Sequence, residues 1–230
     1  MAKLWDISPP VDAQSPVFPG DTEYRQVWGA TIGPGCPVNV SAITLSPHTG
    51  AHADAPLHYE ADAAAVGALS LEPFLGPCRV IHAIGAGPLV GLASLAHALA
   101  PTAAPLPPRV LVRTYAKAPI TAFDPDCAAF EPATLEALAD LGVRLVGIDT
   151  ASVDPAASKT LDSHQVLRRR GLRVLENLVL DEVPEGDYEL IALPLKLTSA
   201  DASPVRAVLR ELESVSRSVG GESVDGGIRP

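Results

Sequence analysis

Cysteine is scarce in this chain, which limits what can hold the fold together. The 230 residues include three cysteines, Cys36, Cys78 and Cys127. They form no Cys-x-x-Cys pair and no even set, so the sequence excludes a framework of disulfides. We expect each of them to be a small buried residue in a protein of the reducing cytoplasm.

Long apolar segments and runs of basic residues are also missing. The first eight residues lack the apolar core of a signal peptide, and no apolar run is long enough to cross a membrane. Seventeen Lys and Arg stand against 27 Asp and Glu, which gives a formal net charge of −10. That charge disfavours nucleic acid and anionic membranes, so neither is expected as a partner.

The residues that are present favour one α/β domain. Hydrophobic residues make up 47% of the chain and aromatic residues 4%. Strands and helices are expected to alternate from about residue 78 onward, which favours a compact layered β/α fold over residues 1–212. Residues 213–230 are rich in Ser, Gly and charge and are expected to form a flexible tail. The expected strands cover 3–7, 24–32, 38–46, 78–84, 110–113, 144–148 and 188–193; the expected helices cover 92–100, 132–141 and 161–170, with a short helix or flap at 62–75.

Residues 46–58 hold three of the six histidines, His48, His52 and His58, with Asp54 among them. Imidazole nitrogens and carboxylate oxygens are the usual donors to zinc or manganese. A polar surface loop with coincidental histidines is the alternative, but four donors in thirteen residues favour a metal site that activates water.

The spacing of these four residues suggests how they would meet. Pro47, Gly50 and Pro56 disfavour a helix across the segment. In an extended segment, side chains two positions apart share a face. All four donors stand at even positions, so an extended chain would point them the same way.

Two groups far downstream are further candidates. His164 follows Leu-Asp-Ser at the expected start of a helix, and Glu176 interrupts an apolar run. A buried carboxylate is costly unless it is paired or metal-bound. The alternatives are a solvated helix-start histidine and an outward-facing glutamate. Asp149 and Asp154 follow a strand and could support ligands or simply form turns.

The motif His-Thr-Gly-Ala-His-Ala-Asp-Ala-Pro-Leu-His resembles the signature of the cyclase-like metal-dependent hydrolase family. Other segments extend the resemblance, among them Phe-Pro-Gly-Asp (18–21), Gly-Ile-Asp-Thr-Ala-Ser-Val-Asp-Pro (147–155), Leu-Asp-Ser-His (161–164) and Leu-Glu-Asn-Leu (175–178). It runs from about Trp5 to Leu212. Within the family, the combination is most similar to the bacterial kynurenine formamidase branch.

The resemblance implies a function and a swivelling β/α/β-like fold. Members of this branch hydrolyse N-formyl-L-kynurenine, an arylformamide of tryptophan degradation, with a binuclear site that is usually zinc, although manganese is an alternative. The family commonly forms homodimers. The implied ligands are His48, His52 and Asp54 for one ion and Asp54, His164 and Glu176 for the other, with Glu176 able to touch both.

The resemblance also assigns two residues that are not ligands. His58 becomes the proton-transfer residue, the general acid/base. Phe18 takes the place of an aromatic residue, often Trp, that stacks on the substrate's ring. Phe keeps the stacking surface and loses the indole N–H. Ala51 is a second departure, because the broader family often has Thr there.

Other functions remain open at the level of sequence. The same ligand set would support isatin hydrolysis or cleavage of another cyclic amide or ester. A metal-binding regulatory or structural subunit without turnover is a different class of protein. The presence of His58, beyond what ligation requires, argues against that second class.

Overall fold

Four parallel strands form the middle of the main sheet. The structure is a computed structural model that describes residues 2–99 and 105–212. The strands are β5 (Leu75–His82), β7 (Arg109–Arg113), β9 (Leu145–Ile148) and β10 (Arg173–Glu176). Each is hydrogen-bonded in parallel to the next, as strand–helix–strand connections require.

Antiparallel strands flank this centre on both sides. On the β5 side lie β11 (Gly186–Ile191), β13 (Val208–Glu211) and β1 (Leu4–Asp6); on the β10 side lie β4 (His52–Asp54) and β12 (Ala202–Pro204). The nine strands run in the order β1-β13-β11-β5-β7-β9-β10-β4-β12. Segments from both ends of the chain therefore extend the sheet next to its parallel centre.

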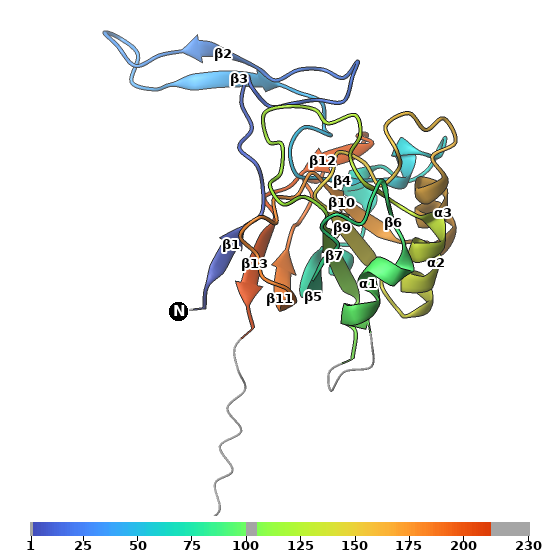
Figure 1. The fold of residues 1–230 in the computed structure, drawn as a ribbon. Helices are drawn as coiled ribbons and strands as arrows, with labels where there is room; N and C mark the ends of the chain where they lie inside the picture. Colours follow the sequence, from blue (N-terminus) through green and yellow to red (C-terminus); the bar gives the residue numbers. More distant parts are fainter. Residues whose placement is uncertain (1, 100–104, 213–230) are drawn as a thin grey trace, which may run out of the picture.

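Three helices cover one face of the sheet (Figure 1). They are α1 (Leu92–Leu99), α2 (Pro132–Asp140) and α3 (Asp162–Arg170). Val110 and Val112 pack in the core beneath the helices, while Leu111 packs in the core on the opposite face. This is the two-residue period of a strand buried on both sides.

The sheet curls around the hydrophobic core on its other face, the one that the helices do not cover. Ile7, which follows the first strand, belongs to the same buried cluster as Ala51, which precedes β4 near the other end of the sheet. The amide of Val179 also donates to the carbonyl of Ile7 across 2.9 Å, joining the two sides. Inside the curl there is no room at Gly147, where a β-carbon would lie 2.5 Å from Leu111 Cδ2.

The remaining elements are short, apart from one hairpin. Strands β2 (Arg25–Ala30) and β3 (Val40–Thr44) pair with each other and extend away from the body of the protein (Figure 1). Strands β6 (Leu89–Val90) and β8 (Ala129–Phe130) form a two-stranded parallel sheet. Three 3-10 turns occupy Pro56–His58 (η1), Val66–Ala68 (η2) and Glu72–Phe74 (η3).

The predicted α/β fold class is confirmed, with some local differences. The segment 62–75 forms two 3-10 turns and no α-helix, and Cys36 is only half-buried whereas Cys78 and Cys127 are buried. The expected tail, 213–230, lies outside the described residues. Among the described residues, no helix has the length and apolar character needed to span a membrane.

The extended conformation predicted for residues 46–58 is wrong. Only His52–Asp54 is a strand. Before it, Thr49 N donates to Ser46 O and Gly50 takes a φ of +68°, which makes a turn. After it, His58 N donates to Ala55 O and begins a 3-10 turn. Local turns, and not one straight strand, therefore set the directions of His48 and His58.

Gly147 gives a prediction for stability. Gly147→Ala would place a methyl group against Leu111 and Leu178, so we expect a loss of about 1–3 kcal/mol in the free energy of unfolding. Gly33→Ala is the matched control, because a β-carbon there meets nothing within 4 Å. Urea denaturation measures both. Equal stability of the two variants would contradict the close packing inside the curl.

Candidate metal centre

The five predicted ligands come together from separate parts of the chain. His52 and Asp54 lie on β4, and His48 lies in the turn before it. Glu176 ends β10, which pairs with β4 so that Glu176 stands directly opposite His52. His164 lies in the first turn of α3. The strand register and the start of one helix thus bring these residues together.

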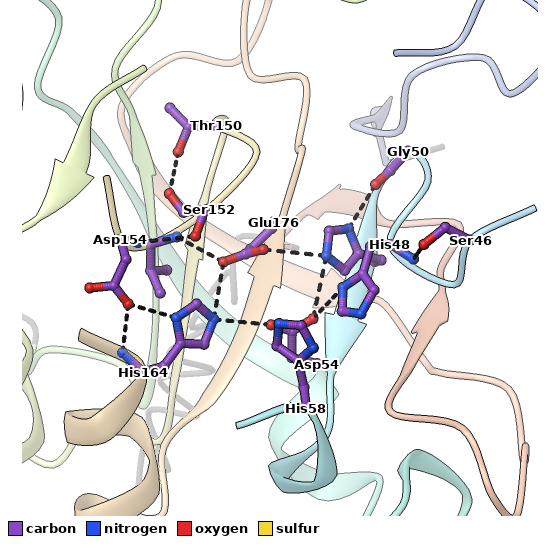
Figure 2. A network of polar contacts seen from close by, with 12 residues as sticks. Ser46, His48, Gly50, Asp54, His58, Thr150, Ser152, Asp154, His164 and Glu176 are labelled. Atoms are coloured by element: carbon purple, nitrogen blue, oxygen red, sulfur yellow. Dashed lines mark hydrogen bonds and ion pairs between the residues drawn. The ribbon is translucent and has the colours of Figure 1, made fainter. Parts of the chain in front are cut away.

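Asp54 is at the centre of the cluster (Figure 2). Its Oδ1 lies 3.1 Å from His48 Nδ1 and 3.3 Å from His52 Nε2, and its Oδ2 lies 3.3 Å from His164 Nε2. Glu176 also contacts two histidines, with Oε2 3.3 Å from His52 Nε2 and Oε1 3.8 Å from His164 Nε2. Each of the two carboxylates therefore has one oxygen near His52 and the other near His164.

The second nitrogen of each of these three imidazoles is held by an acceptor outside the cluster. An ionised carboxylate or a carbonyl only accepts, so each contact fixes an N–H on that nitrogen. The acceptors are Asp201 Oδ2 for His48 Nε2 at 3.0 Å, Gly50 O for His52 Nδ1 at 2.9 Å and Asp154 Oδ2 for His164 Nδ1 at 2.6 Å. The nitrogen that faces Asp54 is therefore the one that would offer its lone pair to a metal ion, once the ion displaces the proton there.

The spacing and burial of these donors fit a metal ion. Two donors at zinc-bond distances of about 2.0–2.1 Å lie roughly 3.3 Å apart in a tetrahedral shell, close to the separations observed here. His52 Nε2 and Asp54 Oδ1 are also buried without a hydrogen-bond partner. Unpaired buried polar atoms are costly, and a shared cation would satisfy both of these. His48, Asp54 and His58 form one group that could hold an ion, and His52, Asp54 and Glu176 form a second.

The pKa values of the clustered side chains also show that the site favours positive charge. Burial alone would lower the pKa of His52, but the adjacent carboxylates of Asp54 and Glu176, each 3.3 Å away, outweigh burial and raise that pKa to about 10. At His164, burial would likewise lower the pKa, but the hydrogen bond that the ring donates to Asp154 outweighs burial and raises that pKa to about 10. Burial would raise the pKa of Asp54, yet its histidine partners hold it well below the ordinary value. Without a metal ion, protons take its place, and metal binding would release them.

His58 and a residue not identified from sequence complete the open side of the cluster. The ring of His58 lies 4.3 Å from that of His48, and its Nδ1 is 3.3 Å from Asp201 Oδ2. Asp201 thus contacts both histidines from the loop before β12. No spacing rule pointed to it, because it stands 153 residues after His48.

The two aspartates left open at the sequence level have different surroundings. Asp154 accepts from the amides of Ser163 and His164 as well as from the His164 ring. Asp149 lies apart from the cluster and accepts from Thr114 and Tyr115. Asp154 therefore orients a predicted ligand, whereas Asp149 fixes a neighbouring loop.

Phe18 borders the space above the cluster. The hollow over the histidines is lined by Phe18, His58, His164 and Glu176, among others. Phe18 also lines an adjoining, more apolar hollow, where its ring meets Phe123 edge-on at 5.3 Å. An aromatic side chain therefore stands beside the polar cluster at a partly exposed position.

A buried set of histidine and carboxylate donors beneath an open hollow is suited to a hydrolase that works through bound metal ions. The family comparison agrees with that class. Residues 5–155 match the family described as putative cyclase, and the chain belongs to this family. The resemblance inferred from the motif is confirmed.

Related proteins cover nearly the whole chain. Kynurenine formamidase from Delftia acidovorans is 74% identical over 91% of this chain and 98% of its own, and that from Paracidovorax citrulli is 72% identical over 90% and 96%. Among solved structures, a potential metal-dependent hydrolase with cyclase activity superimposes with a TM-score of 0.78 at 28% identity, covering 93% of this chain and all of that chain. An isatin hydrolase shares the fold, with a TM-score of 0.77 at 22% identity over 91% of this chain and 92% of its own.

The contact between Asp154 and His164 gives a prediction for metal affinity. Asp154→Asn would leave a single acceptor oxygen for the three N–H groups that now donate to the two carboxylate oxygens. Loss of such a partner typically weakens metal binding about 10–100-fold. We expect that loss in a competition titration with a zinc chelator.

Asp149→Asn is the matched control. It also neutralises a buried carboxylate that accepts several bonds, but outside the cluster. Both variants are expected to lose stability, whereas only the Asp154 variant should lose affinity. Parental affinity in the folded Asp154 variant would refute the orienting role.

Proposed function

We propose that this chain hydrolyses the formamide bond of N-formyl-L-kynurenine and releases L-kynurenine and formate in the cytoplasm. The observation that carries the choice of substrate is the 74% identity to a kynurenine formamidase over 91% of the chain. The isatin hydrolase shares the fold at 22% identity, which favours the formamide over isatin. The three described cysteines are free thiols, as in a reducing compartment.

The proposal includes two metal ions, zinc by preference. Asp54 and Glu176 each direct one oxygen towards His52 and the other towards His164, so both carboxylates would be able to serve two ions. Histidine nitrogens with carboxylate oxygens suit zinc and also manganese. The proposed ligands are His48, His52, Asp54, His164 and Glu176.

In the proposed mechanism, His58 moves the proton. Bound metal supplies an activated water and polarises the formyl carbonyl. Donation from His58 Nδ1–H to Asp201 leaves Nε2 able to accept the proton that the water loses on attack. The C–N bond then breaks, and His58 returns that proton to the aryl nitrogen, which leaves as a neutral amine. The transfer matters because an anilide anion is a poor leaving group.

Phe18 is proposed to hold the aromatic ring of the substrate. It is 38% exposed at the edge of the hollow that contains His58 and His164. Its edge-to-face contact with Phe123, at 5.3 Å between ring centroids, helps to fix the ring at this position. A substrate ring there would keep its formyl group on the polar side.

A second copy of the chain is the proposed partner. The hairpin β2–β3 carries large apolar side chains that a monomer leaves in water, among them Val27 at 67% and Trp28 at 55% exposure. Val40 and Ile43 are exposed on the paired strand. An exposed apolar surface of this kind marks an association site.

The experiment that tests the function compares two substrates. We expect kcat/KM for N-formyl-L-kynurenine to exceed that for isatin by at least about 100-fold, because a site complementary to one transition state discriminates against another. Kynurenine release and isatin ring opening are both followed by absorbance. A preference for isatin would replace the proposed substrate, and zinc-loaded, folded protein inert to both would favour a protein without turnover.

The role of His58 gives a separate prediction. His58→Ala should lower kcat roughly 100- to 10,000-fold, as expected for a lost acid/base group, while the zinc content of the purified protein stays at the parental value. His97→Ala is the control, because His97 is an exposed histidine paired with Glu185 far along the chain. Loss of zinc from the His58 variant would make His58 a ligand, and near-normal kcat would remove it from the mechanism.

The hairpin gives a prediction for assembly. Trp28→Glu should convert a dimer to a monomer in sedimentation velocity, because a charge would replace buried apolar surface. Leu141→Glu changes a similarly exposed side chain just after α2 and should leave the dimer intact. A parent protein that sediments as a monomer would contradict the proposed partner.

A further inference from the structure

The hollow over the cluster is lined by acids and by a single lysine. Its carboxylates include Asp21, Glu176 and Asp201. Lys159 is the one Lys or Arg among the described residues that line it. Away from the proposed metal ligands, an anionic group entering this hollow would be repelled by Asp21 and Asp201 and attracted by Lys159.

Lys159 is held at the edge of the hollow by a defined loop. Ser158 N donates to Pro155 O across 2.8 Å, and Leu161 N donates to Ser158 Oγ across 3.0 Å. Leu161 then takes a φ of +52° and leads directly into α3, the helix that carries His164. A left-handed leucine is unfavourable, so the surrounding contacts must hold the loop in this conformation. The loop therefore fixes the backbone at Lys159 relative to the cluster.

The ammonium group of Lys159 is available for a ligand. The side chain is exposed, and among residues 2–99 and 105–212 it makes no hydrogen bond or ion pair. Most arginines elsewhere on the surface, such as Arg168 with Glu60 and Arg206 with Asp6, have carboxylate partners. A cation that pairs with none of the three acids lining the same hollow is suited to an incoming anion.

We propose that Lys159 binds the α-carboxylate of the substrate and so selects amino-acid formamides over other arylformamides. This inference rests on the proposed function. The substrate carries its formamide at one end and its carboxylate at the other. With the formamide at the cluster, the carboxylate needs a cation away from the acids, at the edge of the same hollow. Lys159 is a specificity-determining residue in this account, and it takes no part in bond cleavage.

The test uses two substrates that differ only in the carboxylate, N-formyl-L-kynurenine and N-formylkynuramine. Lys159→Met should raise KM for N-formyl-L-kynurenine about tenfold with little change in kcat, and it should leave N-formylkynuramine unaffected. Lys159→Arg should restore most of the lost affinity, because it restores the charge. Lys196→Met is the matched control, since Lys196 is an exposed lysine outside the hollow.

Binding of the product supplies a readout that does not depend on turnover. By calorimetry, the zinc-loaded parent should bind L-kynurenine about tenfold more tightly than kynuramine, and Lys159→Met should abolish that difference. Equal losses for both substrates, or an unchanged preference for the carboxylate in the Met variant, would overturn the role of Lys159. Hydrolysis of neither formamide by the zinc-loaded parent would instead overturn the proposed function, and the inference with it.

Discussion

Two buried carboxylates impose the constraint on which the rest of the site depends. The side chain of Asp54 is fully buried and that of Glu176 is 4% exposed, and in the described part of the chain both form ion pairs with histidines and none with a lysine or arginine. Buried negative charge is costly unless positive charge, a metal ion or several hydrogen bonds compensate for it. The outer acceptors, Asp154, Asp201 and the Gly50 carbonyl, fix the histidines so that their free nitrogens face the same oxygens. The cluster is thus preorganised for cations before any substrate arrives.

The scaffold provides this arrangement because the sheet is mixed. A purely parallel sheet would place functional groups at the ends of strands, whereas here the antiparallel β4 runs beside β10 and sets His52 opposite Glu176. The helix α3 adds His164 from its first turn, where Asp154 also accepts two amides. Four of the five proposed ligands lie on a strand or in a helix and His48 lies in the turn before β4, whereas the more open groups, Phe18, His58 and Asp201, come from turns and loops at the surface of the site. Rigid ligands and a more accessible rim suit a site that holds ions firmly and exchanges substrates.

Much of the local structure could be predicted from the sequence, and the reasons are physical. Pro132 at the start and Gly142 just after the end define α2, and Gly171, with a φ of +64°, ends α3 as a glycine can. The prediction that His48, His52, Asp54 and His58 lie close together is correct. The predicted backbone conformation is wrong, because two turns replace the expected extended segment. Asp201 could not be found from spacing, since only the pairing of β12 with β4 brings its loop beside His48. Long-range strand pairing decides such contacts, and a single sequence does not encode it in any local pattern.

The central claim is that this cluster works as a metal centre for formamide hydrolysis. The most direct test strips the protein with a chelator, confirms that it stays folded, and follows hydrolysis of N-formyl-L-kynurenine as zinc is added back. Zinc bound per chain is counted on the same samples. The account predicts no turnover in the stripped protein and activity that rises to a plateau as two zinc ions bind per chain. Full turnover by folded, metal-free protein would contradict it.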